Sequence, residues 1–381
     1  MPADEPEGLR LLEAAGADAA AVPLLVGADG SVHASPDLVT VAAVAGLSTT
    51  PAEDFHDLLI VGGGPAGLGA AVYGASEGLR TVLVDSSATG GQAGQSSRIE
   101  NYLGFPDGVS GGQLADRARR QAVRFGADVL TARAVAGLTV DGPTRRVHFT
   151  DGTSVSARSV LLSTGVQYRR LPAPGVDTLI GRGVYYGSAS TEAEACADQH
   201  VFVVGGANSA GQAAVFFTRF ARQVTVLVRG DSLQASMSSY LIEQVTSIDN
   251  LDVRTCTEVT EAHGEDHLEA LTLRHRVSGA TERVDAGHLF VFIGAAPRTD
   301  WLDGVVARDD NGFVLTGPDL LIDGERPSGW HEPRDPYYLE LSVPGVFVAG
   351  DVRAASVKRV ASAVGEGAMA VTLAHRYLEQ S

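Results

Sequence analysis

The stretch Leu58-Leu-Ile-Val-Gly-Gly-Gly-Pro-Ala-Gly-Leu68 decides the fold. Its first four residues predict a buried strand, and the small residues from Leu68 to Ser76 predict a helix. In the glycine run between them, Gly62 permits a tight turn, Gly64 lets a pyrophosphate approach the backbone, and Gly67 lets the helix pack closely on the strand. The helix N-terminus would then face the phosphate charge. The stretch therefore predicts a dinucleotide-binding strand–turn–helix unit.

The residues that follow extend this unit and then repeat it. Thr81-Val-Leu-Val-Asp85 predicts a second strand that ends in an acid, where a carboxylate can bind ribose hydroxyls. A near-copy of the first stretch, Val201-Phe-Val-Val-Gly-Gly-Ala-Asn-Ser-Ala-Gly211, starts 143 residues further along. Short β-rich runs alternate with helical ones from Asp57 onward, which is typical of α/β layering with parallel strands. The chain is expected to hold two nucleotide-binding units.

The second unit departs from the first at its glycine positions and at its second strand. Gly205, Ala207 and Ala210 occupy the three glycine positions, and the strand Val224–Val228 ends in Arg229. A guanidinium at that place favours the 2′-phosphate of NADPH, whereas a carboxylate would favour NADH. A solvated surface arginine is the alternative interpretation, so NADPH is favoured and NADH stays possible.

Composition bounds the class of protein. The chain has 381 residues, 44% of them hydrophobic and 20% charged, which fits a globular protein of two or three domains. A net charge of −17 without a basic patch argues against a nucleic-acid partner. The N-terminus is acidic and the apolar stretch Ala14–Val26 is interrupted and short, so we expect no signal peptide and no membrane partner. Cys196 and Cys256 are expected to be reduced thiols, and a cytoplasmic protein is predicted.

The first fifty residues form a pattern of their own, which resembles the second half of a thioredoxin fold. The pattern predicts a helix over Leu9–Ala15, a strand over Pro23–Val26, a turn over Gly27–Gly30, a strand over Ser31–His33 and a helix over Pro36–Leu47. The half that carries the redox Cys-x-x-Cys in that fold is absent from the sequence. This truncated segment, residues 1–50, is expected to dock on the rest of the chain.

From about Phe55 to the C-terminus, the chain resembles the low-molecular-weight thioredoxin reductases of the pyridine nucleotide-disulfide oxidoreductase superfamily. The motifs that carry the resemblance occur in the family's order: Gly90-Gly-Gln-Ala-Gly-Gln-Ser-Ser-Arg-Ile-Glu-Asn-Tyr102, Ser163-Thr-Gly165, Gly294-Ala-Ala-Pro-Arg-Thr299, Gly345-Val-Phe-Val-Ala-Gly-Asp351 and Gly365-Glu-Gly-Ala-Met-Ala370. The resemblance implies an α/β fold with two Rossmann-like three-layer nucleotide-binding domains. An FAD-binding domain of residues 55–169 plus 294–381 would carry an inserted NAD(P)-binding domain of residues 170–293.

The resemblance also implies cofactor contacts, residue by residue. FAD would lie on Gly62, Gly64, Pro65, Ala66, Gly67, Asp85, Gly91, Gln92, Ser96, Asn101, Thr164, Gly165, Gly350, Asp351, Lys358, Arg359 and Val360. NADPH would lie on Gly206, Ala207, Asn208, Ser209 and Arg229. Two positions depart from the family pattern: Lys358-Arg359 stands where the family has Arg-Gln, and Gly230 stands where it has a second arginine.

The largest departure from the family concerns its redox dithiol. In the family, Arg-Gly-Val-x-Tyr leads into Cys-x-x-Cys, but here Arg182-Gly-Val-Tyr-Tyr186 leads into Gly187-Ser-Ala-Ser190. Gly187 and Ser190 occupy the two cysteine positions, and neither can store an electron pair as a disulfide. No catalytic side chain is therefore assigned. The pair His263 and His267 is interpreted as part of a hairpin turn rather than as metal ligands, and no metal is expected.

These features lead to one hypothesis and two alternatives. The chain is expected to be an FAD-dependent oxidoreductase in which hydride passes from NADPH to FAD and electrons then go directly to a small-molecule or protein acceptor. By resemblance it should be a homodimer. The alternatives are an FAD-dependent oxidase or tailoring enzyme that acts on a small organic substrate without NADPH, and a non-enzymatic flavin redox sensor.

Overall fold

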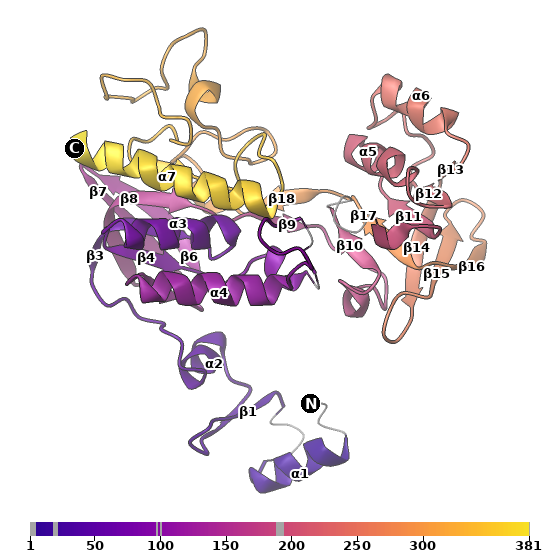
Figure 1. Ribbon diagram of the computed structural model, residues 1–381, viewed down its shortest axis with the longest axis horizontal. Coiled ribbons are helices and arrows are strands. Elements are labelled where there is room, and N and C mark those ends of the chain that lie inside the picture. Colours follow the sequence, from indigo (N-terminus) through magenta and orange to yellow (C-terminus); the bar gives the residue numbers. More distant parts are fainter. Residues whose placement is uncertain (1–4, 18–21, 97, 100, 188–193, 381) are drawn as a thin grey trace. The chain divides into compact units, whose positions relative to one another are not determined.

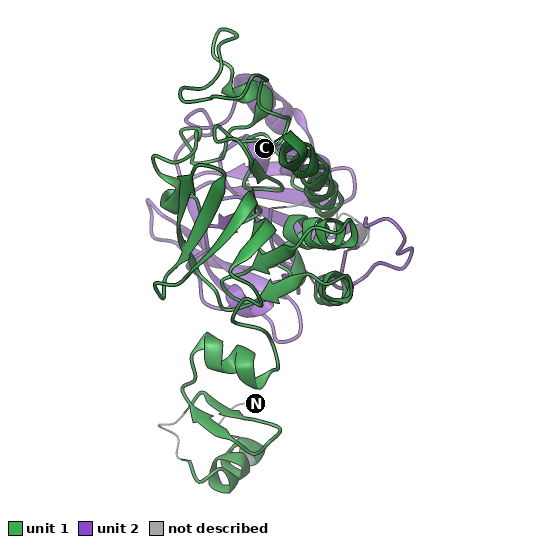
Figure 2. Ribbon diagram, turned by 90° about the vertical axis from the view of Figure 1, so that its left-hand side faces the viewer, with its two compact units in different colours: residues 1–94, 112–165, 297–381 green, residues 95–111, 166–296 purple. Residues whose placement is uncertain are grey.

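The computed structural model describes residues 5–17, 22–96, 98–99, 101–187 and 194–380. The chain divides into two compact units (Figures 1 and 2). The first unit comprises residues 1–94, 112–165 and 297–381, and the second comprises residues 95–111 and 166–296. The chain therefore leaves the first unit and returns to it twice.

The first unit is built on a seven-stranded sheet. Its strand order is β5-β4-β3-β8-β7-β6, and β19 pairs with β8. The strands β5, β4, β3, β8 and β19 run parallel, and β6 and β7 add an antiparallel meander. The strands are β3 (Phe55–Val61), β4 (Thr81–Val84), β5 (Asp128–Leu130), β6 (Val135–Asp141), β7 (Thr144–Phe149), β8 (Ser154–Leu162) and β19 (Val346–Val348), and the helices are α3 (Pro65–Ser76), α4 (Gly111–Arg124) and α7 (Val360–Gln380).

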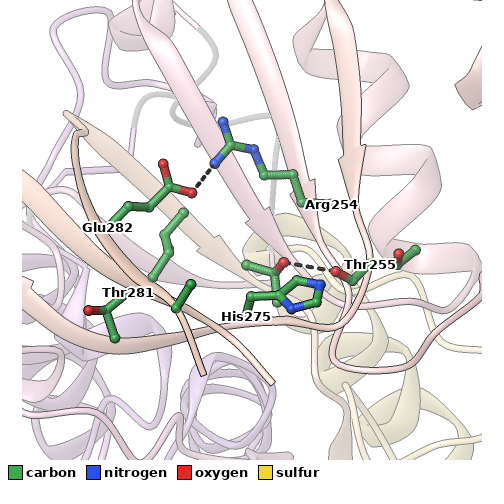
Figure 3. Close-up of a pocket in the computed structure, with 8 residues that line it drawn as sticks. Arg254, Thr255, His275, Thr281 and Glu282 are labelled. Carbon is green, nitrogen blue, oxygen red and sulfur yellow. Dashed lines mark hydrogen bonds and ion pairs between the residues drawn. The ribbon is translucent and has the colours of Figure 1, made fainter. Parts of the chain in front are cut away.

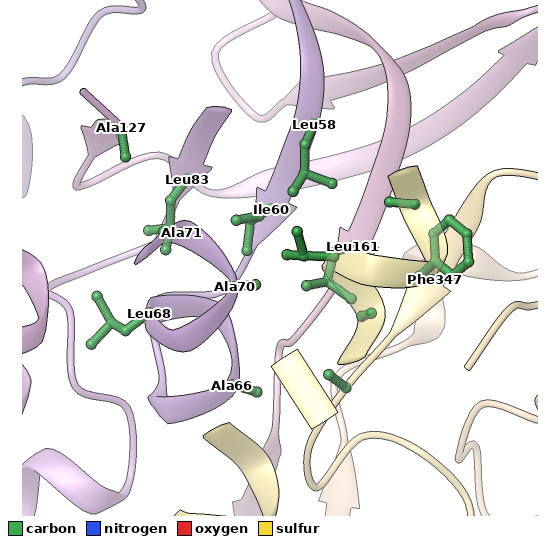
Figure 4. Packing of buried hydrophobic residues seen from close by; sticks show 14 of the residues in the cluster. Leu58, Ile60, Ala66, Leu68, Ala70, Ala71, Leu83, Ala127, Leu161 and Phe347 are labelled. Atoms are coloured by element: carbon green, nitrogen blue, oxygen red, sulfur yellow. The ribbon is translucent and has the colours of Figure 1, made fainter. Parts of the chain in front are cut away.

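The parallel strands of the first unit are buried on both faces. Along β3, Leu58 and Ile60 pack into one apolar cluster with α3 and α7, while Leu59 and Val61 pack into a second cluster. Figure 4 shows the first cluster, with Leu58 and Ile60 facing the small side chains of α3. Strands of this kind read as continuous hydrophobic runs in the sequence because neither face meets water.

Helices α3 and α7 approach each other closely enough to require glycine. A Cβ placed at Gly367 would lie 2.1 Å from the Ala66 carbonyl oxygen, and one at Gly69 would lie 3.1 Å from the Val364 carbonyl oxygen. Helix α3 begins at Pro65, three residues before the predicted start at Leu68. Proline is accepted there because the first turn of a helix needs no N–H from it.

The second unit contains a parallel sheet and an antiparallel one. The five-stranded parallel sheet has the order β10-β17-β11-β12-β13, and β14, β15 and β16 form a three-stranded antiparallel sheet. The predicted hairpin between His263 and His267 is confirmed, since β14 and β15 flank it. The elements are β10 (Val184–Tyr186), β11 (His200–Val204), α5 (Asn208–Phe217), β12 (Gln223–Leu227), α6 (Ser239–Ser247), β13 (Leu251–Arg254), β14 (Thr257–His263), β15 (Ala270–His275), β16 (Thr281–Asp285) and β17 (His288–Val291).

Two short strands, β9 (Val166–Tyr168) and β18 (Ala295–Pro297), pair where the chain passes from one unit to the other. Short 3₁₀ turns complete the structure at Ala93–Gln95, Asp177–Leu179, Glu194–Cys196, Asp300–Leu302 and Gly317–Leu320. No helix in the described part of the chain is long and apolar enough to cross a bilayer.

The N-terminal segment forms its predicted elements in the predicted order. They are α1 (Pro6–Ala14), β1 (Leu24–Val26), β2 (Val32–Ala34) and α2 (Leu38–Val44). The turn between the two strands is closed by a bond of 3.0 Å from the Gly30 N–H to the Gly27 carbonyl. Asp37 caps α2 by accepting from the Thr40 N–H at 2.8 Å. The likeness to half a thioredoxin fold stays a prediction.

Candidate functional site

The glycine-rich loop of the first unit joins β3 to α3, and two of its glycines admit no side chain. Gly62 has φ +107°, and a Cβ there would lie 2.4 Å from the Ser163 carbonyl oxygen. A Cβ at Gly67 would lie 1.9 Å from the Gly62 carbonyl oxygen. Gly64, by contrast, faces open space at the start of α3, and no side chain caps this helix. The loop therefore leaves room for an anion at a helix N-terminus.

A second glycine pair lies against this loop. The Gly90 N–H donates to the Gly63 carbonyl at 2.7 Å, and a Cβ at Gly91 would lie 3.2 Å from Gly64 Cα. Asp85 joins them, because its Oδ2 accepts from the Gly63 N–H at 2.7 Å. The structure thus brings together three of the predicted FAD contacts, Gly64, Asp85 and Gly91, from separate parts of the sequence.

The carboxyl ends of β8 and β19 contribute the next group of predicted residues. The Thr164 Oγ1 is buried and has no hydrogen-bond partner among the described residues, and the same holds for the Oγ of Ser356, which follows β19 at a greater distance in the sequence and was not among the predicted contacts. Burial raises the pKa of Asp351 above the ordinary value, while the charge of Lys358 acts in the opposite direction. Buried hydroxyls in proteins normally have partners, so these orphaned groups fit a site completed by a polar ligand.

Glu366 on α7 fixes the turn that carries Asp351, a role that sequence reasoning missed. Its Oε2 accepts from the Gly350 N–H at 2.7 Å, and its Oε1 accepts from Arg353 Nε at 3.2 Å. The Arg353 side chain is 8% exposed. The sequence signal for this role is that Glu366 is an acid within a helix of mostly small and apolar residues. A buried carboxylate in such a helix needs a polar partner.

The other predicted FAD contacts are distributed over both units. Pro65 and Ala66 form the first turn of α3, Gly165 ends the segment after β8, and Arg359 and Val360 begin α7. Lys358 Nζ lies 4.9 Å from the centre of the Phe313 ring. Gln92 follows Gly91 in the first unit, whereas Ser96 and Asn101 belong to the second compact unit.

The nucleotide loop of the second unit joins β11 to α5. A Cβ at Gly205 would lie 2.5 Å from the Phe292 carbonyl oxygen, so glycine is required there as at Gly62. Asn208 Oδ1 accepts from the Ser238 N–H at 2.8 Å, which ties α5 to the start of α6. Ala207, Ser209 and Arg229 are exposed, and Gly206 is half-buried. The predicted NADPH contacts therefore border one accessible helix N-terminus.

The first of the two dithiol positions has a defined environment. Gly187 has φ +67°, and a Cβ there would lie 2.7 Å from Tyr168 Oη and 3.0 Å from the Cζ of that ring. The Tyr186 hydroxyl accepts from the Leu171 N–H at 2.9 Å, and its ring centre lies 6.2 Å from that of Tyr168. Ser190 lies outside the described residues. Cys196 is buried, Cys256 is partly buried, and neither is in a disulfide.

An open pocket of about 430 Å³ lies elsewhere in the second unit, between β13 and the β15–β16 hairpin (Figure 3). Its charged groups already pair with each other, since Arg254 donates to Glu282 at 2.8 Å. No function is assigned to this pocket. Among the described residues, no group of three or more His, Cys, Asp or Glu side chains could hold a metal ion.

A parallel sheet with a glycine-rich turn in each of two units is the architecture of two-domain dinucleotide-binding flavoproteins. Residues 56–367 match the family described as pyridine nucleotide-disulphide oxidoreductase. The chain is 34% identical over 325 residues to a thioredoxin reductase of Mycolicibacterium smegmatis, an alignment that covers 85% of this chain and 97% of the relative. The crystal structure of thioredoxin reductase from Streptococcus pyogenes has a TM-score of 0.77 at 30% identity, and the match covers 86% of this chain and 99% of that one.

The chain belongs to the pyridine nucleotide-disulphide oxidoreductase family and is a thioredoxin-reductase-like flavoprotein oxidoreductase. A thioredoxin reductase of Peptoclostridium acidaminophilum is 32% identical over 333 residues, covering 86% of this chain and 98% of the relative. The predicted family and the predicted fold class are confirmed. The first fifty residues lie outside the family match.

Proposed function

We propose that this protein is an NADPH-dependent FAD oxidoreductase that passes electrons to its acceptor without a disulfide of its own. The observation that carries the proposal is the environment of Gly187. A cysteine there would need a strained left-handed backbone, and its Cβ would overlap Tyr168. The surroundings of this position therefore disfavour a cysteine, in agreement with the glycine that the sequence has there.

The first unit offers a site of the kind that FAD requires. Gly64 and Gly91 leave backbone open for a pyrophosphate, and Asp85 stands at the strand end where a ribose would lie. Thr164 and Ser356 hold buried hydroxyls that a ligand would satisfy. Bound FAD would supply the redox chemistry, accepting a hydride from NADPH and delivering the electron pair to an acceptor. Asp351 would hold the ribityl chain, with Glu366 orienting the Gly350–Asp351 turn.

The second unit is proposed to bind NADPH. The accessible start of α5, at Ala207, Asn208 and Ser209, suits the pyrophosphate. Arg229 is exposed two residues after the end of β12, and its guanidinium favours a 2′-phosphate over a free ribose hydroxyl. NADPH rather than NADH is therefore the expected electron donor.

The acceptor is proposed to be a small molecule or a redox protein. The relatives from Mycolicibacterium smegmatis and Peptoclostridium acidaminophilum are thioredoxin reductases, so a thioredoxin-type partner is one member of this class. Without a dithiol relay, such a partner would have to receive electrons at the flavin itself. A homodimer and a cytoplasmic location complete the proposal, and the absence of a disulfide at Cys196 and Cys256 fits a reducing compartment.

The proposal is tested by anaerobic mixing of the flavin-loaded protein with NADPH and, separately, with NADH, followed by a count of reactive thiols under denaturing conditions. NADPH should bleach the flavin absorbance rapidly, NADH should do so more slowly, and the thiol count should stay at the two cysteines of the chain. Absence of bleaching with either nucleotide would overturn NADPH dependence. A thiol count that rises from zero before NADPH is added to two afterwards would overturn the absence of a dithiol.

A further inference from the structure

The family's second arginine for the 2′-phosphate is Gly230 in this chain, and the structure offers a replacement from a distant segment. Arg276 follows β15 and lies 47 residues from Arg229 in the sequence. Its Nη1 donates to the Arg229 carbonyl at 3.0 Å. We propose that Arg276 is the second guanidinium that selects NADPH at the end of β12. This inference rests on the proposed function of the second unit.

The backbone around Cys256 places Arg276 there. Cys256 adopts a left-handed conformation with φ +50°. Its N–H donates to the Gly230 carbonyl at 2.7 Å, and its carbonyl accepts from the Arg276 N–H at 2.7 Å. One residue therefore bonds both the loop after β12 and the start of the β15–β16 turn. These bonds fix the Arg276 backbone beside the Arg229–Gly230 peptide.

The space at this strand end is open. Within 4 Å, a Cβ added at Gly230 would meet only the Ser232 carbonyl oxygen, at 3.7 Å, so the space next to the Gly230 backbone is open. The bond from Arg276 to the Arg229 carbonyl uses one of the five N–H donors of a guanidinium. The remaining donors suit a phosphate, which arginine binds in a forked geometry.

Glu258 lies near Arg276 and weakens the attraction of its guanidinium for a phosphate, but it does not cancel that attraction. Glu258 Oε2 lies 3.6 Å from Arg276 Nε, but Glu258 Oε1 is engaged more closely by Arg274 Nε at 3.0 Å. The Arg276 side chain is 48% exposed, so water and salt weaken its interaction with the acid. Arg229 is exposed, and its guanidinium has no hydrogen bond or ion pair among the described residues. Two guanidinium groups would therefore meet a 2′-phosphate.

The test is calorimetric binding of 2′,5′-ADP and of 5′-ADP to the flavin-loaded protein. Arg276→Ala should bind 2′,5′-ADP about tenfold more weakly, the loss expected for one charge-assisted hydrogen bond, with unchanged affinity for 5′-ADP. Arg276→Lys keeps the charge and should recover part of the loss. Arg283→Ala is the matched control, because Arg283 is an exposed arginine of the same hairpin with no contact to Arg229.

The outcomes separate this inference from the proposed function. Equal affinity of wild type and Arg276→Ala for 2′,5′-ADP, with NADPH still bleaching the flavin, would overturn the role of Arg276 and leave the proposed function standing. Equal losses in Arg276→Ala and Arg283→Ala would also overturn it, because they would indicate a general effect of charge. A wild type that neither binds 2′,5′-ADP nor is bleached by NADPH would overturn both.

Discussion

The two glycine-rich loops have the same connectivity, but they differ in whether the third glycine position has room for a side chain. In the first unit, Gly67 packs so closely on the Gly62 peptide that a Cβ would lie 1.9 Å from its carbonyl oxygen. In the second unit, the matching position is Ala210, whose methyl group is fully buried. The start of α5 therefore leaves room for a methyl group beside its strand, whereas the start of α3 does not. A glycine at this position thus indicates that the helix packs very closely on its strand. Replacement of that glycine by alanine need not abolish nucleotide binding.

The difference in packing between the two loops is tested most directly by exchanging the residues at the third glycine position. Gly67→Ala should destabilise the protein by about 3 kcal/mol or more, because the added methyl group meets backbone that cannot move aside. Ala210→Gly should cost only about 1 kcal/mol, the propensity difference in a helix. Denaturant unfolding of both variants checks this. Similar losses in the two units would show that the loops pack alike.

The units also differ in the side chain that holds a turn of the candidate cofactor site in place. In the first unit the brace is ionic, since Glu366 pairs with the buried Arg353. Glu366→Ala should cost about 3 kcal/mol, because it leaves a buried guanidinium without its partner. Glu366→Gln keeps an acceptor for the Gly350 N–H and should lose less. Asp116→Ala removes an exposed ion-pair partner on α4 and serves as the control, with an expected loss of about 0.5 kcal/mol or less. A loss from Glu366→Ala as small as the control's would refute the brace.

In the second unit the brace is neutral. Asn208 Oδ1 accepts from the Ser238 N–H, so Asn208→Ala should cost about 1 kcal/mol, the net value of one ordinary hydrogen bond. Ser209→Ala, one residue along on the exposed start of α5, should change the free energy of unfolding little. Thermal unfolding of the two variants side by side measures the difference. Equal free energies of unfolding for Asn208→Ala and Ser209→Ala would show that the Asn208 hydrogen bond does not stabilise the second unit.

The smallest expected effect concerns Asp351 in the protein stripped of FAD. Burial raises the pKa of this carboxyl, so the folded state binds its proton more tightly than the unfolded state. The contribution of Asp351 to stability should therefore fall as the pH rises from the ordinary carboxyl pKa to the raised one. Asp351→Asn should stabilise the FAD-free protein at pH 7 and have little effect well below pH 3.8. A stability difference that is independent of pH would contradict the raised pKa.

The parts predictable from sequence are those in which the signal is local. The Gly62–Gly67 turn, the buried run of β3 and the hairpin after His263 depend on neighbouring residues, and all appear in the structure. Helix α3 begins earlier than predicted because Pro65 and Ala66 form its first turn rather than the end of the loop. The motif order was sufficient to identify the family, since it spans most of the chain.

The parts that escaped prediction depend on contacts between distant segments. Tyr168 beside Gly187, Glu366 beside Gly350, and Arg276 beside Arg229 each join residues that no periodic pattern relates. Strand pairing and the left-handed turn at Cys256 bring the last pair together. Residue type alone could not show that a tyrosine occupies the space beside the first dithiol position.

The central claim is that the flavin is the only group in this protein that stores an electron pair, and an anaerobic reductive titration tests it most directly. The flavin-loaded protein is titrated with NADPH while the flavin absorbance is followed. FAD accepts two electrons, and FAD together with a disulfide accepts four, so the equivalents consumed count the redox groups. The account predicts complete bleaching at one equivalent of NADPH per flavin. Two equivalents per flavin would contradict it.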